Sequence, residues 1–224
     1  MPGRRSRASN PLPTKRAYHH GDLRRDLLDQ ALALVEEKGP AALTLREAAR
    51  RAGVTEAAPY RHFRSKDALV AALAAEGFQA LRDRTERGLA RAGALPVDRL
   101  CALGTAYVRF ARDRPAHFHV MFGREIAASH GFREVRDAAQ ACFAALIREV
   151  ADAQRAGAVR GRDPRGPALA LWSALHGLAS LQVEGLLARQ GLSAPGPRGA
   201  EALARGVVES LLAGLGTGSK GEGL

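Results

Sequence analysis

The stretch Leu43–Phe63, LTLREAARRAGVTEAAPYRHF, decides the fold, because it has the pattern of two short helices joined by a glycine turn. Thr44 can cap the first helix, and Gly53 supplies a tight reversal before Thr55 caps a second helix. The first helix would bury a small apolar face made of Leu45, Ala48, Ala49 and Ala52. The second helix is too short and too poor in large apolar residues to be stable alone. This arrangement is typical of a helix-turn-helix, in which the second helix enters a DNA groove.

The spacing of apolar residues on both sides of this stretch predicts further helices. We expect them at about 22–38, 65–81, 100–113, 134–155, 168–190 and 200–213. A sustained alternation of apolar and polar residues is missing, so we assign no strands and predict an all-α protein. The chain should divide into a disordered basic arm at 1–17, a three-helix head at 18–66, a larger helical body at 67–214 and a flexible tail at 215–224.

The chain of 224 residues is strongly basic, with 34 Lys and Arg against 23 Asp and Glu and a formal net charge of +11. The first 70 residues hold 14 of the basic and 8 of the acidic side chains, which concentrates positive charge around the turn motif. Such a distribution favours a polyanionic partner. An apolar run of the ~20 residues that cross a bilayer is missing, and so is the apolar segment of a signal peptide. We therefore expect a cytoplasmic protein.

The string GVTEAAPYRHFRSKDAL, together with the long helix expected before it, resembles the TetR family of transcriptional regulators over about Tyr18 to Leu73. The resemblance implies a DNA-binding head whose second turn-motif helix lies in the major groove. It implies DNA contacts by Thr44, Arg46, Thr55, Glu56, Ala57, Ala58, Pro59, Tyr60, Arg61, His62 and Lys66. Family members are most often repressors that bind a pseudo-palindromic operator as a homodimer.

These residues are expected to have different roles on DNA. The hydroxyl, imidazole and ammonium donors would hold phosphates, and Lys66 would do so where a helix dipole already favours an anion. Ala57, Ala58 and Pro59 would face base edges, with specificity coming from thymine methyls, from Glu56 or Arg61, and from DNA shape. The alternative is that the aromatic residues here only build the core, and for Phe63 we expect this, as a wedge between helices.

The segment ALALWSALHGLASLQVEG contains Trp172, His176 and Gly177 and resembles a TetR C-terminal domain subclass named after this Trp-His-Gly trio. The segment FHVMFG resembles the companion motif of the same subclass. This likeness implies a body that binds a small molecule and dimerises. We expect an effector pocket lined by Tyr107, Phe110, Phe118, Met121, Phe122, Trp172 and His176. The effector would be apolar or aromatic, with one polar group against His176; the alternative is that these residues are simply core.

Two other kinds of function compete with a ligand-responsive regulator. Body histidines can suggest a metal site or a metal-dependent helical hydrolase: His117, His119, His130 and His176. However, His117 and His119 are two residues apart, which sends them to different faces of a helix, and no HExxH-like pattern completes a site. We therefore expect no metal, no cofactor and no catalysis. A DNA-binding protein without an effector would instead have a filled body.

The last two expected helices are rich in leucine and can form a four-helix interface between two copies of the chain. Two heads related by a two-fold axis would contact half-sites about one DNA turn apart, ~34 Å, or at a longer separation. This geometry predicts the pseudo-palindromic operator.

Overall fold

The computed structural model describes residues 22–124, 126, 131–192 and 196–216, and in these ranges every regular element is a helix. The prediction of an all-α protein is therefore confirmed. The basic arm, the first residues of the expected head and the chain after residue 216 lie outside the described residues.

The head begins with α1 (Leu23–Lys38), which forms where the sequence predicts it. The Asp22 carboxylate accepts from the Arg25 backbone N–H at 2.9 Å, and Gly39, with φ of 78°, ends the helix. A 3-10 turn, η1 (Pro40–Ala42), leads to α2 (Leu45–Arg51). Leu27, Leu34 and Leu43 are completely buried and form the core of this small unit.

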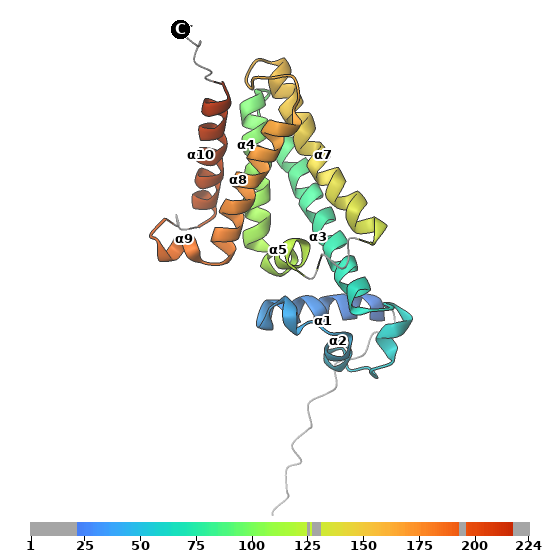
Figure 1. Ribbon diagram of the computed structural model, residues 1–224. Coiled ribbons are helices and arrows are strands. Elements are labelled where there is room, and N and C mark those ends of the chain that lie inside the picture. The colour runs from blue at the N-terminus through green and yellow to red at the C-terminus, as the bar shows by residue number, and fades with distance from the viewer. Residues whose placement is uncertain (1–21, 125, 127–130, 193–195, 217–224) are drawn as a thin grey trace, which may run out of the picture.

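The helix α3 (Lys66–Leu89) joins the head to the body (Figure 1). Its first turn is capped by Ser65, whose hydroxyl oxygen accepts from the Ala68 backbone N–H at 3.2 Å. At 24 residues it is long enough to lie in both units.

The body is a bundle in which α4 (Pro96–Asp113) is central. Figure 1 shows α3 and α7 (Arg133–Arg155) on one side of α4 and α10 (Gly196–Gly216) on the other, while α8 (Arg165–Val183) crosses in front of α4. The short helix α5 (Pro115–Phe122) lies between the bundle and α1.

The body differs from the expectation in two segments, one helix that is interrupted and one that was not expected. The helix expected over 168–190 is interrupted at Gly185, which has a left-handed backbone with φ of 68°, and α9 (Leu186–Arg189) follows as a separate turn. The aromatic segment that the sequence did not assign to a helix is α5, which begins with Pro115 as its first residue.

Candidate DNA interface and effector cavity

The turn motif has a different second element from the one we expected. The first helix, α2, is capped as predicted, with the Thr44 hydroxyl oxygen accepting from the Glu47 backbone N–H at 3.1 Å. The recognition element is a 3-10 helix, η2 (Ala58–Arg61), and it has no side-chain cap. The Thr55 carbonyl oxygen accepts from the Ala58 N–H at 3.0 Å, so the predicted capping role of the Thr55 side chain is wrong.

Pro59 explains this difference. In an α-helix capped at Thr55, the N–H of residue 59 would donate to the Thr55 carbonyl, and proline has no N–H. The turn therefore closes one residue earlier, through Ala58. Pro59 itself is buried, which corrects the prediction that it faces base edges.

The other predicted DNA contacts remain accessible to solvent. Tyr60 is 59% exposed, an unusual value for an aromatic side chain. Ala58 and Lys66 are half-buried, while the remaining contacts are exposed: Thr44, Arg46, Thr55, Glu56, Ala57, Arg61 and His62. Phe63 is only 3% exposed, so its predicted role in the core is confirmed. The guanidinium of Arg24 lies 5.4 Å from the centre of the Phe63 ring.

An ion pair links the two halves of the motif. Arg46 Nε on α2 lies 2.8 Å from Glu56 Oε2 in the turn before η2, and both side chains are largely exposed. Two of the predicted DNA contacts are thus paired with each other in the free protein. The sequence did not reveal this pairing, because the two residues are ten positions apart and belong to different elements.

The packing of α2 on α1 also depends on an arginine. Arg51 binds Glu37 in a two-pronged arrangement, with Nη1 at 3.0 Å from Oε1 and Nη2 at 2.7 Å from Oε2. Hydrogen bonding to Arg51 lowers the pKa of Glu37. The head is therefore held together by a small apolar core and a bidentate ion pair on its edge.

The body contains a cavity of about 690 Å³ between α3, α4, α5, α7 and α8. Four of the seven residues predicted for the effector pocket line it: Tyr107, Met121, Phe122 and Trp172. Aliphatic and aromatic side chains from α3 and α7 complete the wall, among them Phe78, Leu81, Phe143, Leu146 and Ile147. The sequence showed α7 as a helix with an apolar stripe but could not show that this stripe faces a cavity.

The other three predicted pocket residues do not line the cavity. Phe110 and Phe118 are 1% and 4% exposed and belong to the core near α5. His176 lies behind the lining, where its Nδ1 is 2.8 Å from the Tyr107 hydroxyl. The His176 ring also packs against Phe122, with ring centres 4.7 Å apart.

The contact between Tyr107 and His176 has a defined protonation state. Burial raises the pKa of Tyr107 far above its ordinary range and lowers the pKa of His176. At neutral pH both groups are therefore uncharged, and the tautomer of His176 sets whether the Tyr107 hydroxyl or the Nδ1–H group is the donor. His176 orients a side chain that faces the cavity, although it does not face the cavity itself.

A few polar groups interrupt the apolar wall. Thr85 is buried on α3, and the Cys142 thiol donates to the Phe78 carbonyl at a sulfur–oxygen distance of 3.4 Å. Burial raises the pKa of Cys142 to about 11, so the thiol stays protonated. Arg82 and Glu86 form an ion pair of 3.6 Å and contribute charged side chains to the lining.

The body histidines are dispersed over different contacts. His117 is buried and its Nε2 has no hydrogen-bond partner, while His119 Nε2 lies 3.2 Å from Glu184. Within the described residues no group of three or more His, Cys, Asp or Glu side chains is placed to hold a metal ion. His130 lies outside the described residues.

Comparison with protein families matches both units of the chain. Residues 27–73 match the bacterial regulatory proteins of the tetR family, and residues 100–211 match the Tetracyclin repressor-like C-terminal domain. The second match does not distinguish the Trp-His-Gly subclass, which stays a prediction. Comparison with curated protein sequences returned no match.

Solved structures share the fold over nearly the whole chain. A protein of unknown function from Rhodococcus sp. RHA1 is 34% identical, with 91% of this chain and 100% of that one covered and a TM-score of 0.75. A tetR-family regulatory protein from Rhodococcus RHA1 is 23% identical over 87% and 97% of the two chains, with a TM-score of 0.68. The regulator FadR from Bacillus subtilis, in complex with stearoyl-CoA, is 15% identical over 87% and 100%, with a TM-score of 0.68.

A capped helix-turn-helix head on a helical body with an apolar cavity defines a class of ligand-binding, DNA-binding regulators. The chain belongs to the TetR family of transcriptional regulators. Among the described residues, no helix combines the length and the hydropathy needed to span a membrane.

Proposed function

We propose that this protein is a ligand-responsive repressor that binds a pseudo-palindromic operator as a homodimer and is released by a small effector in the body. The cavity of about 690 Å³ carries this proposal, because it lies against the same helix, α3, that begins at the DNA-binding head. Its volume is within the range of about 300–1,000 Å³ that small-molecule sites occupy. A DNA-binding protein without an effector would have a filled body, and the family match does not favour the alternative of a metal-dependent hydrolase.

On DNA, the exposed face of the motif would hold phosphates through hydroxyl, imidazole and ammonium donors. The groups proposed to do so are Thr44, Arg46, Thr55, Tyr60, Arg61, His62 and Lys66. Ala57 and Ala58 would lie against base edges, and Glu56 would fix the direction of Arg46 through their ion pair. Pro59 would act by shaping η2 from within.

The effector is proposed to be apolar or aromatic with a single polar group. The walls are mostly aliphatic and aromatic, and the polar groups on them are few. The related fold of FadR accommodates stearoyl-CoA, which supports an effector with a substantial apolar part. We assign the polar contact to Tyr107, with His176 holding its hydroxyl in position.

The effector signal would reach the head along two helices. α3 lines the cavity with Phe78, Leu81 and Thr85 and carries Lys66 at its first turn. α5 lines it with Met121 and Phe122 and packs against α1. Release of DNA requires that the effector bind the conformation with displaced heads more tightly, by about 1–3 kcal/mol for a typical coupling.

The dimer would form through an open face of α8 and α10. On α8 this face consists of Gly166, Leu169, Ser173, Gly177 and Leu181. On α10 it includes Gly206, Ser210 and Gly214. A Cβ atom added at Gly177 or Gly206 would meet nothing within 4 Å, so a second copy can approach closely there. Other leucines expected at the interface, Leu175, Leu178, Leu187 and Leu212, are buried within one copy.

The operator is the first test of the proposal. Fragments of genomic DNA selected by the purified protein should share a pseudo-palindrome, and a labelled duplex carrying it should bind in an electrophoretic mobility assay. Replacing Tyr60 by Phe and His62 by Ala should weaken binding without changing the selected sequence. Selection of no common motif would refute the proposed function.

The dimer is tested with a matched pair of variants. Ser173→Arg places a charge in the proposed interface, whereas Ala156→Arg places the same charge on an exposed residue after α7. We expect the first variant alone to sediment as a monomer and to lose operator binding. If both variants remain dimeric, α8 is not the interface.

The effector site is tested by placing a larger side chain in the cavity. Ala139 lines the cavity, so Ala139→Phe should prevent the effector from releasing the protein from operator DNA and leave operator affinity nearly unchanged. Ala156→Phe is the control for adding the same ring at an exposed position. Release that survives in Ala139→Phe would show that the effector binds elsewhere.

A further inference from the structure

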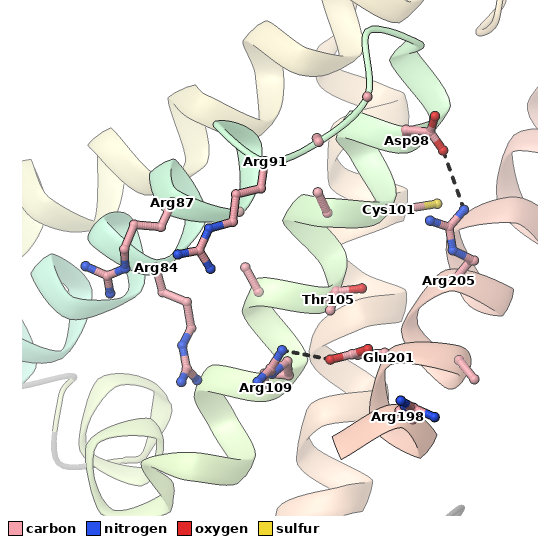
Figure 2. A pocket seen from close by; sticks show the side chains of 16 residues that line it. Arg84, Arg87, Arg91, Asp98, Cys101, Thr105, Arg109, Arg198, Glu201 and Arg205 are labelled. Carbon is pink, nitrogen blue, oxygen red and sulfur yellow. Dashed lines mark hydrogen bonds and ion pairs between the residues drawn. The ribbon is translucent and has the colours of Figure 1, made fainter. Parts of the chain in front are cut away.

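A second cavity, of about 860 Å³, lies on the opposite side of α3 and α4 from the effector cavity; α10 forms its other wall, and it is open to solvent (Figure 2). The helical period separates the two sites, because Arg84 and Arg87 leave α3 on the side away from Arg82 and Glu86, which line the effector cavity. The two cavities therefore share helices but no lining residue.

The walls of this second cavity are dominated by arginine. Six arginines line it, five on the helices α3, α4 and α10 and one, Arg91, in the turn after α3: Arg84, Arg87, Arg91, Arg109, Arg198 and Arg205. Only two carboxylates, Asp98 and Glu201, line it with them. Burial raises the pKa of the Cys101 thiol, so this group stays neutral and adds no further negative charge.

The two carboxylates are already engaged. Glu201 accepts from Arg109 Nη1 at 2.7 Å, and Asp98 lies 3.7 Å from Arg205 (Figure 2). Arg87, Arg91 and Arg198 have no ion pair within the part of the chain that the structure describes. Glu209 also pairs with Arg205 at 3.2 Å, and Asp113 pairs with Arg84 at 2.7 Å, so the positive charge that the surrounding protein leaves unpaired is that of three of the six arginines.

One further donor in the lining is unsatisfied. Arg84 donates through Nη2 to Asp113 at 2.7 Å, but its Nη1 is buried without a hydrogen-bond partner. A buried guanidinium donor without an acceptor is unfavourable, and an anion beside it would remove that cost.

The floor of the cavity leaves room for a ligand. It is made of small residues, among them Gly88, Ala92, Ala102 and Ala106, with the hydroxyl of Thr105 as an additional donor. Long arginine side chains around a floor of small residues can converge on one bound group from several directions.

We propose that this cavity binds a small-molecule polyanion that carries two or more phosphate groups. Guanidinium groups bind phosphate oxygens in bidentate fashion, and several arginines on three helices suit linked phosphates better than one isolated charge.

DNA is a less suitable occupant of this cavity than a small polyanion. Residues 84–91 lie about 27 Å or more along α3 from Lys66 at its rise of 1.5 Å per residue, so the cavity is remote from the head. A second copy of the chain would not cover this cavity in the proposed dimer. The open face of α10 at Gly206 and Ser210 lies on another side of that helix from Glu201 and Arg205, which line the cavity.

The occupant would join α3, which carries the head, to α10, which belongs to the proposed dimer face. It would act in addition to the effector, because the cavities are separate. This inference does not depend on the identity of the effector or the operator.

The test uses inorganic tripolyphosphate as the probe and measures its binding to the full chain by calorimetry at constant ionic strength.

Three triple variants are compared with the wild type. The first, called the groove variant because it changes the arginine-rich cavity, carries Arg87→Gln, Arg91→Gln and Arg198→Gln, and it breaks no ion pair of the described residues. The control carries Arg160→Gln, Arg162→Gln and Arg165→Gln, which removes the same charge from exposed positions near the start of α8. A third variant, Arg46→Gln with Arg61→Gln and Lys66→Gln, removes three charges from the head.

We expect the groove variant to bind tripolyphosphate at least about tenfold more weakly than the wild type, while the control and head variants stay within about twofold. Absence of binding to the wild type would overturn the proposal. Equal weakening in the groove and control variants would also overturn it, because binding would then follow net charge alone. Weakening only in the head variant would place the anion on the DNA-binding face and overturn it as well.

Discussion

At the scale of single residues, the proposed DNA-binding face contains an acidic side chain among basic ones. Glu56 pairs with Arg46 at 2.8 Å, and both are exposed to solvent. An exposed pair of this kind contributes little to stability, about 0–1 kcal/mol, so its effect on binding can be separated from its effect on folding.

Glu56→Gln should increase affinity for DNA of unrelated sequence by about fivefold, because it frees Arg46 and removes repulsion with phosphates. Glu134→Gln, which neutralises an exposed carboxylate on α7, should have little effect. Fluorescence anisotropy with a non-operator duplex measures both. An equal increase in the two variants would mean that net charge, and not the ion pair, controls affinity.

Two histidines of the body, the buried His117 and the half-buried His176, predict a pH dependence of stability. Burial lowers the pKa of both His117 and His176 below the ordinary value of 6.5, so the unfolded chain takes up protons at a higher pH than the folded one. The free energy of unfolding should therefore fall as the pH drops from about 7 towards 5, by up to about 1.4 kcal/mol per pH unit for each histidine.

The variant His117→Gln should reduce this slope, since it removes one of the two groups. His117 Nε2 has no hydrogen-bond partner to lose. Urea unfolding at several pH values measures the slope independently of any uniform loss of stability. Identical slopes for wild type and variant would contradict the assignment.

At the scale of elements, the two threonines of the turn motif have different structural roles despite their similar positions before short helices. Thr44 caps α2 with its side chain, whereas Thr55 takes part in its turn through its backbone carbonyl. Pro59 causes this difference by removing the N–H that a longer helix would need.

Thr44→Ala should therefore lower the free energy of unfolding by about 1 kcal/mol, the usual value of a lost N-terminal cap. Thr55→Ala should change it by less than about 0.5 kcal/mol and weaken operator binding instead. Denaturant unfolding and DNA binding of the two variants give the comparison. Equal destabilisation would show that the Thr55 side chain has a structural role after all.

At the scale of the whole molecule, α3 connects three sites. Its N-terminus lies at the head, one face lines the effector cavity, and the other lines the arginine-rich cavity. A dimer would carry each of these sites twice. A substitution that removes one phosphate contact per chain would therefore remove two contacts from the complex of the dimer with DNA.

Lys66→Ala should thus reduce the slope of log affinity against log salt concentration by about 2, since each lost phosphate contact accounts for ~0.9. Base preference should stay unchanged, because a phosphate contact carries no sequence information. Operator binding measured between low and moderate salt gives the slope. An unchanged slope would remove Lys66 from the interface.

The sequence by itself determined most of the helices, the cap at Thr44, the helix starts at Asp22 and Ser65, the first helix of the turn motif and the family. These depend on local spacing, and each cap is satisfied within three residues of itself. Tertiary structure alone decided that Pro59 faces inward, that Arg46 meets Glu56, that His176 lies behind the pocket wall and that arginines of three helices surround one cavity. The physical reason is that helical periodicity tells which residues share a face, whereas the packing of helices far apart in the chain decides what that face meets.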